Sequence, residues 1–477
     1  MKYALLNRDI RAKKDTIFFM VCIGVYVLLS SVLYYAVPHI SSHLDIDSLW
    51  YDKYAVHFFQ TGSITAPHGP TAAPEHTIGY PLIMSLIYKV FGYTFTPIIL
   101  IQIVCMIILM WALFNMTYRL FGPLSARIVA VLSILNVGVL VYPQFVLTET
   151  IVTCLIVLFL ERFTKFWQTA SRTVLVVSAT FLGASLIVKP VALYFIPVVA
   201  CFVPLYVSGM RKKFMAILLF LTIALAPLVG YMTRNKVLYN HFHFAPVVSI
   251  NLYEWYLVKV IAAVHDITPS EAERMIPPFE AHNGLDENGW EPAKKLLLWY
   301  LAHHPYTCIS VWMKNVMKTA LGLFSTHLKL LLNPMLRGGD ITFFSGTGSW
   351  WNKIVTYVSS GAPNRLVVAI AAAESMWSIL RWLLIVSAGM LLWVRKRYAI
   401  LAFFMLFVAY NLMITGHDGC GRYRFIIEPQ LIMLTAFALA AWWDILMQRR
   451  VRELGVSVYN NYAPIPVVSY QSKSRER

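Results

Sequence analysis

The chain has 477 residues, of which 58% are hydrophobic and only 13% are charged. This balance excludes an ordinary soluble globular protein, because such a protein could not cover its apolar residues with polar surface. The formal net charge of +17 would suggest nucleic-acid binding in a soluble protein. In a membrane protein, the positions of Lys and Arg instead report the topology.

Windows of about 20 apolar residues, the length that crosses a hydrocarbon core, recur along the chain. They predict an all-α polytopic membrane protein with about 10 transmembrane helices, in a range of about 10 to 13. The predicted spans are 16–38, 97–118, 124–142, 149–166, 173–188, 190–208, 214–232, 368–394, 398–415 and 425–446.

Lys and Arg gather at alternate connections between these spans. By the positive-inside rule, the clusters are cytoplasmic, so ten spans return both termini to that side. We therefore expect a multi-pass protein of an inner or plasma membrane, with a bacterial cell membrane as the first choice. The clustered residues are Lys2, Arg8, Arg11, Lys13, Lys14, Arg119, Arg127, Arg162, Lys165, Arg172, Arg211, Lys212, Lys213, Arg395, Lys396, Arg397, Arg449, Arg450 and Arg452.

The spans divide the chain into four regions. Residues 1–232 form an N-terminal transmembrane module that includes a first external loop, 39–96. Residues 233–367 form a second external loop, 368–446 the C-terminal transmembrane helices, and 447–477 a basic cytoplasmic tail. No Walker or dinucleotide-binding glycine pattern occurs, which disfavours an ATP-driven pump.

Both external loops contain segments suited to helices at the membrane interface. Residues 47–60 mix aromatic with charged side chains, and 79–91 are apolar but too short to span. Residues 306–332 are also apolar. We assign them to an interfacial or partly embedded helix, because a further span would place the basic cluster at 395–397 outside.

Asp45 and Asp47 follow directly after the first span, where a carboxylate can face both water and the membrane interface. Asp47, Tyr51 and Ala55 are spaced by four residues and share one face of a helix. This pattern suits a catalytic acid. Asp is also a favoured N-cap residue, so a purely structural role for Asp47 stays open.

Further polar residues fall on the same predicted face. Glu75 and His76 precede a Gly-Tyr-Pro turn containing Tyr80, where an ordinary solvated loop is the alternative. Glu149 opens the fourth span. An ionisable group at a helix mouth in a membrane suggests function, although the helix dipole alone would also favour an acid there.

Four cations lie near this face as well: Lys189, Arg234, Arg422 and Arg424. Arginines in an external turn oppose the usual charge bias, which favours anion binding over a topological role. A snorkelling anchor is the alternative. Acids and cations at one membrane face can supply a base and a phosphate clamp.

Six short motifs in order resemble the GT-C glycosyltransferase superfamily, close to its protein O-mannosyltransferase and lipid A aminoarabinose transferase group. The matching motifs are Asp47-x3-Tyr51-x3-Ala55 with Gly62, His76-Thr-Ile-Gly-Tyr-Pro-Leu with Phe91-Gly92, Leu147-Thr148-Glu149, Lys189-Pro190, Thr233-Arg234-Asn235 and Arg422-Tyr423.

The resemblance implies transfer of a single sugar, with inversion, from a polyprenyl-phosphate donor to a lipid, glycan or protein hydroxyl at the non-cytoplasmic face. Donor, acceptor and membrane lipids are the expected partners, and nucleic acid is not. Asp47-Ser48 departs from the frequent Asp-Glu pair, which leaves a divalent cation open. The implied site comprises Asp47 as base with Asp45 and Glu149; Arg422, Arg424, Lys189 and Arg234 for the donor phosphate; and Tyr51, Glu75, His76 and Tyr80 for substrate.

Two other functions compete with this interpretation. A lipid-linked-oligosaccharide flippase or transporter would line a path near the bilayer midplane, where Arg381 is the only ionisable residue placed well inside a span, with Glu374 as a partner for a proton relay. Its isolation argues against such a path. A polysaccharide polymerase or ligase would also be multispanning, with a large external loop.

Overall fold

The computed structural model describes residues 2–65, 67, 76–240, 242, 244, 247–277, 291–333 and 348–453, with side chains between 13 and 449. Within these residues the regular structure is entirely helical, which confirms the predicted fold class. Many apolar side chains on the long helices are exposed, among them Ile17, Leu28 and Leu383, each more than 60% accessible. Such surfaces are stable against lipid, and the chain is an integral membrane protein.

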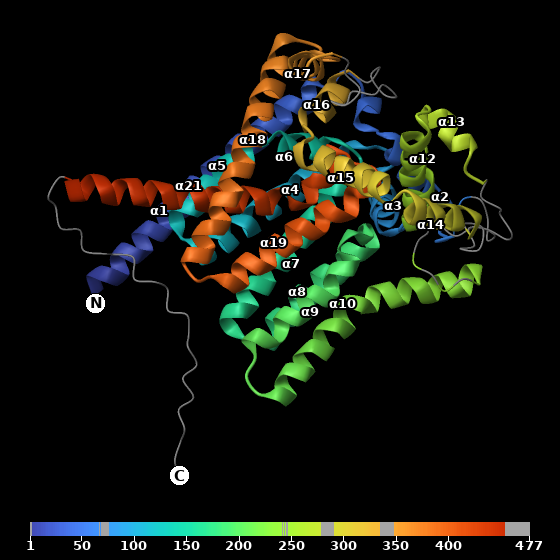
Figure 1. The fold of residues 1–477 in the computed structure, drawn as a ribbon. Helices are drawn as coiled ribbons and strands as arrows, with labels where there is room; N and C mark the ends of the chain where they lie inside the picture. Colours follow the sequence, from blue (N-terminus) through green and yellow to red (C-terminus); the bar gives the residue numbers. More distant parts are fainter. Residues whose placement is uncertain are drawn as a thin grey trace.

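The helices follow one another with short connections, apart from the two long loops (Figure 1). The α-helices are α1 (Lys2–Ala36), α2 (Ile46–Thr61), α3 (Gly79–Phe91), α4 (Thr96–Phe121), α5 (Pro123–Leu135), α6 (Val137–Val141), α7 (Glu149–Thr169), α8 (Arg172–Val188), α9 (Ile196–Phe202), α10 (Met210–Tyr239), α11 (Val247–Ile250), α12 (Leu257–His265), α13 (Pro269–Arg274), α14 (Glu291–His303), α15 (Pro305–Leu321), α16 (Ser325–Leu332), α17 (Trp350–Ser359), α18 (Arg365–Val394), α19 (Tyr398–Ile414), α20 (Gly421–Arg424) and α21 (Glu428–Glu453).

Six helical stretches of the described chain are long and apolar enough to cross a membrane, and a bent pair, 123–135 with 137–144, makes a seventh. Ten spans were expected. The other expected segments are helical too: α7 carries charged residues near its end, and 172–188 and 190–206 are shorter apolar helices. The six stretches are Lys13–Ala36, Thr96–Phe121, Met210–Tyr239, Arg365–Val394, Tyr398–His417 and Gly421–Arg449.

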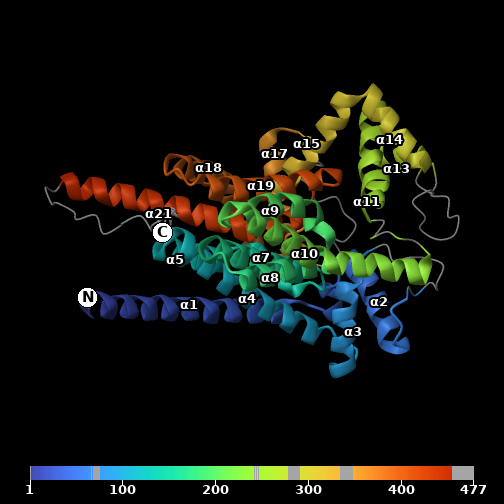
Figure 2. The same cartoon turned by 90° about the horizontal axis from the view of Figure 1, so that it is seen from below.

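The long helices run side by side, and the connecting helices gather at one end. Figure 2 shows the start of α1 and the end of α21 at one end of the bundle, with α2, α3, α13 and α14 at the opposite end. We call this second end the loop end. The start of α1 and the end of α21 therefore lie on the same side, as an even number of membrane crossings requires.

α7 and α21 form the interior of the bundle. α7 packs against α4 and α8, and α21 packs against both α5 and α18. Near the end of α7, Glu161 is almost fully buried and forms an ion pair with Arg119 of α4, with 2.5 Å between Oε1 and Nη1. A buried carboxylate needs such a partner, so this pair fixes the two helices together at the end remote from α2.

The two expected interfacial helices of the first loop are present as α2 and α3. The segment 306–332, expected as one helix, is two: α15 and α16, separated at Gly322. The physical reason is a close approach of backbones, since a Cβ added to Gly322 would lie 2.8 Å from the Cα of Gly421. Neither helix meets the length for a span.

Candidate functional site

The start of α2 carries two acids with different roles. Asp45 is the N-cap residue: its side chain accepts from the Ile46 amide, and its own amide donates to the Ser48 hydroxyl in a capping box. Asp47 lies two residues further, within the first turn. The capping role considered for Asp47 therefore belongs to Asp45, and the Asp47 carboxylate is available for other contacts.

Arg422 of α20 joins three carboxylates that are distant in sequence. Its Nη1 lies 3.1 Å from Asp45 Oδ2, its Nη2 donates to Asp47 Oδ2, and its Nε lies 3.1 Å from Glu149 Oε1. All three guanidinium nitrogens thus face protein carboxylates. We call Asp45, Asp47, Glu149, Arg422 and Lys189 the ion cluster.

Lys189 completes the ion cluster from the end of α8. Its Nζ donates to Glu149 Oε1 at 2.8 Å and lies 5.5 Å from the centre of the Tyr423 ring. Glu149 is 1% exposed, so its charge is stable only because both Lys189 and Arg422 contact it. Counting formal charges, three acids and two cations leave the ion cluster at −1.

A tight packing of α3 against α8 brings the first loop to this cluster. A Cβ added to Gly79 would lie 2.5 Å from the Ile187 carbonyl oxygen, and the Thr77 hydroxyl donates to the Val188 carbonyl at 2.9 Å. Only glycine permits this approach. Gly79, the glycine of the His76-to-Leu82 motif, therefore allows α3 to pack closely on α8. This packing places His76 beside the ion cluster.

The turn before Arg422 is pinned to α15. The Asn315 amide donates to the Gly416 carbonyl at 2.9 Å, and a Cβ added to Gly419 would lie 2.6 Å from Asn315 Cα. Lys259 of α12 also forms a 2.5 Å ion pair with Asp418. These contacts hold the residues that precede α20 and so limit where the Arg422 guanidinium can reach.

Aromatic side chains form a wall next to Asp47. Tyr51 and Tyr80 meet edge to face at 5.2 Å between ring centres, and the Tyr80 hydroxyl donates to Gln102 at 3.0 Å. The His76 ring meets Trp50 edge to face at 4.7 Å. Tyr51 and Tyr80 are buried, so the partly exposed rings of this wall are those of Trp50 and His76.

Burial and the nearby cations set the protonation of Asp47 and His76. The Arg422 guanidinium lowers the pKa of Asp47 to about 2, against the opposing effect of burial. Burial lowers the pKa of His76 to about 4, and the cations Lys189 and Arg422 act in the same direction. At neutral pH, Asp47 is therefore an anion and His76 is uncharged.

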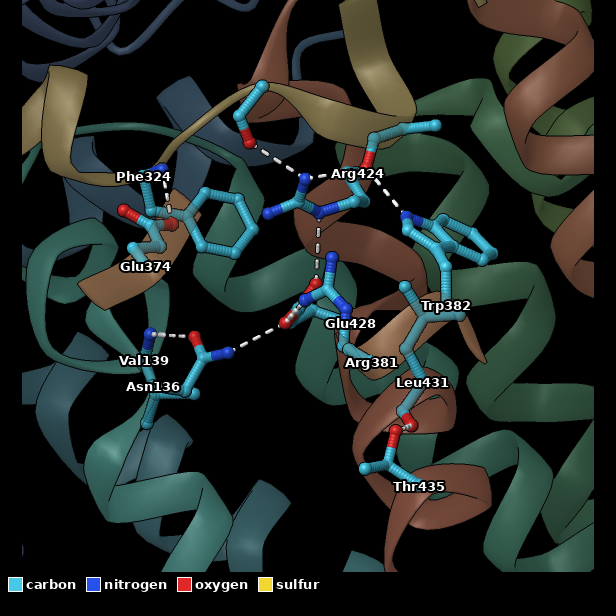
Figure 3. Close-up of polar contacts among 12 residues, drawn as sticks. Asn136, Val139, Phe324, Glu374, Arg381, Trp382, Arg424, Glu428, Leu431 and Thr435 are labelled. Atoms are coloured by element: carbon cyan, nitrogen blue, oxygen red, sulfur yellow. Dashed lines mark hydrogen bonds and ion pairs between the residues drawn. The ribbon is translucent and has the colours of Figure 1, made fainter. Parts of the chain in front are cut away.

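The other predicted site residues lie elsewhere. Arg424 turns away from the ion cluster and contacts Glu428 and the carbonyls of Ala320 and Gly322 (Figure 3). Arg234 donates to the Ile64 carbonyl and to Asn235 at 2.7 Å, so its contacts among the described residues are to the first loop and its own helix. Glu75 lies outside the described residues.

Arg381 is not isolated, which corrects the expectation from sequence. It forms a 2.5 Å ion pair with Glu428, whose carboxylate also accepts from Asn136 at 2.6 Å and pairs with Arg424 at 3.1 Å. Figure 3 shows the side chains of Arg381, Asn136 and Arg424 converging on Glu428. Glu428 was not among the residues predicted from the sequence. Its position four residues after Arg424, at the start of the last span, could have indicated an ion pair between the two.

The described residues contain no group of three or more His, Cys, Asp or Glu side chains placed to hold a metal ion. Three acids do converge at the ion cluster, but the cation between them is Arg422. Asp47 keeps a side-chain exposure of 30%, the highest of the three. The fold and this cluster define a helical membrane protein with an accessible carboxylate at the loop end.

Residues 75–232, about a third of the chain, match the family described as dolichyl-phosphate-mannose-protein mannosyltransferase. This match confirms the predicted resemblance to GT-C membrane glycosyltransferases. It includes His76, Glu149 and Lys189, while Asp47 and Arg422 lie outside the matched segment. No curated protein sequence matches the chain.

Solved structures of two other membrane proteins are among those that align with the chain. The oligosaccharyltransferase AglB from Archaeoglobus fulgidus, in complex with an inhibitory peptide and a dolichol-phosphate, gives a TM-score of 0.49 at 12% identity, over 93% of this chain and 52% of that one. ArnT from Cupriavidus metallidurans, bound to undecaprenyl phosphate, gives 0.40 at 13% identity, over 87% and 77%. The chain spans about half the length of the archaeal enzyme.

Proposed function

We propose that the protein is an inverting GT-C glycosyltransferase that moves one hexose or pentose from a polyprenyl-phosphate carrier to an acceptor hydroxyl, with Asp47 as the base. The family match over residues 75–232 supports the class of reaction. Reaction at the non-cytoplasmic face of a cell membrane follows from the charge bias, since the basic clusters flank the helix ends remote from the loop end. The first loop then supplies Asp47, and α12 and α15 of the second loop contact the turn that carries Arg422.

The observation that carries the proposal is the Asp47–Arg422 contact at the loop end. It places a partly exposed carboxylate against a guanidinium, with Lys189 one contact further through Glu149. Transfer from a sugar phosphate needs both groups, a cation for the phosphate and an acid that can take the proton of the acceptor hydroxyl. Arg422 and Lys189 are our candidates for the phosphate, and Arg424 and Arg234 are withdrawn from that role by their contacts.

Donor binding would activate the base. A carboxylate with a pKa of about 2 is a weak proton acceptor at neutral pH. The guanidinium of Arg422 has five N–H donors and three carboxylate partners, and we propose that the incoming phosphate takes the place of Asp47, the most exposed of the three. Displacing Asp47 removes the main cause of its low pKa, so its basicity rises when the donor is in place.

The reaction then requires one proton transfer. The acceptor oxygen forms a bond to the anomeric carbon as the bond from that carbon to the phosphate oxygen breaks. The acceptor proton passes to Asp47, and polyprenyl phosphate leaves with its charge against Arg422 and Lys189. Tyr51 and His76 lie beside Asp47, Tyr80 packs against Tyr51, and these three residues are our candidates for sugar contacts.

The test uses the purified protein in liposomes with radiolabelled polyprenyl-phosphate sugars, one hexose or pentose at a time, and a cell-envelope extract as acceptor. We expect release of polyprenyl phosphate and label in the acceptor, with the opposite anomer in the product. Movement of intact donor across the bilayer without transfer would instead identify a flippase. Joining of lipid-linked glycans would identify a polymerase or ligase.

A further inference from the structure

Helix α15 carries a stripe of apolar side chains on the surface of the molecule. The stripe residues are spaced by three or four positions, so they lie along one face of the helix. The opposite face includes polar residues, since Asn315 and Thr319 are buried. In water this arrangement is unfavourable, because a surface helix turns its apolar face inwards. The stripe consists of Tyr306, Ile309, Met313, Met317 and Leu321, each more than 40% exposed.

The break between α15 and α16 has its carbonyl groups paired with side chains of α18 and α20. The Ala320 carbonyl accepts from Trp382 Nε1 at 3.1 Å and from Arg424 Nη1 at 2.8 Å. The Gly322 carbonyl accepts from the same Arg424 nitrogen at 2.7 Å. Figure 3 shows the Arg424 and Trp382 side chains reaching these backbone oxygens.

Three successive amides after the break are paired as well. The Leu323 amide donates to the Tyr357 hydroxyl at 3.2 Å. The amides of Phe324 and Ser325 donate to the two carboxylate oxygens of Glu374, at 2.7 and 2.8 Å. Water would satisfy such groups at the surface, but inside a membrane each needs a partner from the protein. Side-chain partners at this break are therefore what a chain reversal in hydrocarbon requires.

The contacts with α18 give the depth of the break. α18 ends at Val394, directly before the basic cluster 395–397 that marks the cytoplasmic side. Trp382 and Glu374 lie roughly 18 and 30 Å from Val394 along the helix, at 1.5 Å per residue. Leu383 is exposed, so lipid reaches α18 at this level. Because the hydrocarbon core is about 30 Å thick and helix tilt shortens both distances, the break lies in the half of the core nearest the loop end.

α15 starts on the water side of this break. The Tyr256 hydroxyl donates to the Cys308 carbonyl at 2.8 Å, and Cys308 belongs to an apolar cluster shared with α12 and α14. α14 carries a half-exposed ion pair, Glu291 with Lys294, which needs water. α15 has 17 residues and is roughly 25 Å long, so it reaches the break from outside but cannot cross the core.

α16 leads back to the same side. The buried ammonium of Lys329 donates to the carbonyls of Tyr357, Val358 and Ser360 at the end of α17, at 2.8 to 2.9 Å. These residues precede Arg365, the first residue of α18, which lies roughly 44 Å from the cytoplasmic end along that helix and therefore beyond the core. The chain thus approaches and leaves the break at the loop end.

We propose that α15 and α16 form a re-entrant helix pair, in which the chain enters the membrane along α15, turns at Gly322 inside the hydrocarbon core and returns along α16. The apolar stripe of α15 then lies against the acyl chains of the leaflet at the loop end, with Tyr306 near the headgroups. Lys314 flanks the stripe, and helical side chains lean toward the helix N-terminus, which here is the water side. The proposal does not depend on the proposed reaction.

The test measures which positions water reaches. Single cysteines are introduced by Met317→Cys, Leu321→Cys, Lys294→Cys and Lys353→Cys into the full-length protein, in sealed proteoliposomes of one orientation. A membrane-impermeant maleimide is added at the loop end, and the unmodified protein gives the background of the native cysteines. Because a thiol reacts as the thiolate, which does not form in hydrocarbon, Met317→Cys and Leu321→Cys should react at least about tenfold more slowly than Lys294→Cys. Lys353→Cys should react from the same side as Lys294→Cys.

A second readout identifies what covers the stripe. A bimane group attached at Met317→Cys before reconstitution should be quenched by lipids that carry a nitroxide on the acyl chain. Fast maleimide labelling of Met317→Cys and Leu321→Cys would place the stripe in water, and slow labelling without quenching would mean that a second copy of the chain covers it. Labelling of Lys294→Cys and Lys353→Cys from opposite sides would make this segment a complete span. Each of these three results would overturn the proposal.

Discussion

The Arg422 guanidinium contacts the Asp47 carboxylate across 375 residues of sequence. This contact joins the first loop to the turn before the last helix and forms the middle of the ion cluster. It also sets the protonation of Asp47, whose pKa it lowers to about 2. Four predictions follow from the ion cluster, and one follows from the Glu428 network.

Arg422→Ala should raise the KM for the sugar donor roughly 10- to 100-fold, because a charge-assisted phosphate contact contributes about 1.5–3 kcal/mol. The KM for the acceptor should stay unchanged. Arg234→Ala is the comparison, since Arg234 contacts the first loop and not the ion cluster. A donor KM that responds equally to both substitutions would remove Arg422 from the phosphate site.

Chelation should leave transfer intact. Arg422 already occupies the position between the three carboxylates, and a divalent cation there would meet its positive charge at close range. We expect unchanged initial rates after dialysis against EDTA. Loss of activity that manganese or magnesium restores would mean that Arg422 moves aside for a metal.

The pH dependence of kcat/KM should be flat between about pH 6 and 8. Asp47 is already ionised there because its pKa is about 2, and His76 is uncharged because its pKa is about 4. As the pH falls through about 4, His76 gains a proton and adds a cation beside Asp47, and activity should fall. His76→Gln should remove that acid limb. An acid limb near the ordinary pKa of histidine would contradict the buried environment of His76.

Glu428→Ala should lower the free energy of unfolding by about 3–5 kcal/mol, because it leaves Arg381 and Arg424 buried without their shared carboxylate. Thermal unfolding in detergent measures the change. Glu291→Ala is the surface control: its pair with Lys294 is half exposed, and its loss should change stability by less than about 0.5 kcal/mol. Similar shifts for both variants would show that the Glu428 network contributes little.

The sequence predicted the features that depend on local pattern. Hydropathy is local, so the segments proposed as spans are helices, and α2 and α3 lie where aromatic and apolar patterns placed them. The four-residue spacing also held: Tyr51 and Ala55 are buried on the face of α2 that carries Asp47. Repeating spacing along one helix fixes direction without any knowledge of partners.

The sequence could not assign partners between distant segments. Arg422 and Arg424 looked equivalent, yet two residues apart on a short helix they point to different sides, one to Asp47 and the other to Glu428. The partner of Arg381 lies 47 residues further along the chain. The break at Gly322 depends on the backbone of Gly421, which no local pattern reveals.

The most direct test of the account compares two carboxylates of α2 in the transfer assay. Asp47→Asn removes the proposed base, whereas Asp52→Asn alters a carboxylate whose hydrogen bonds, among the described residues, come from the Tyr88 and Tyr93 hydroxyls at 2.7 and 2.8 Å. With both variants folded and expressed at normal level, Asp47→Asn should lower kcat by roughly 10²- to 10⁴-fold, and Asp52→Asn should leave it within about threefold. Full transfer by Asp47→Asn would contradict the assignment of Asp47 as the base.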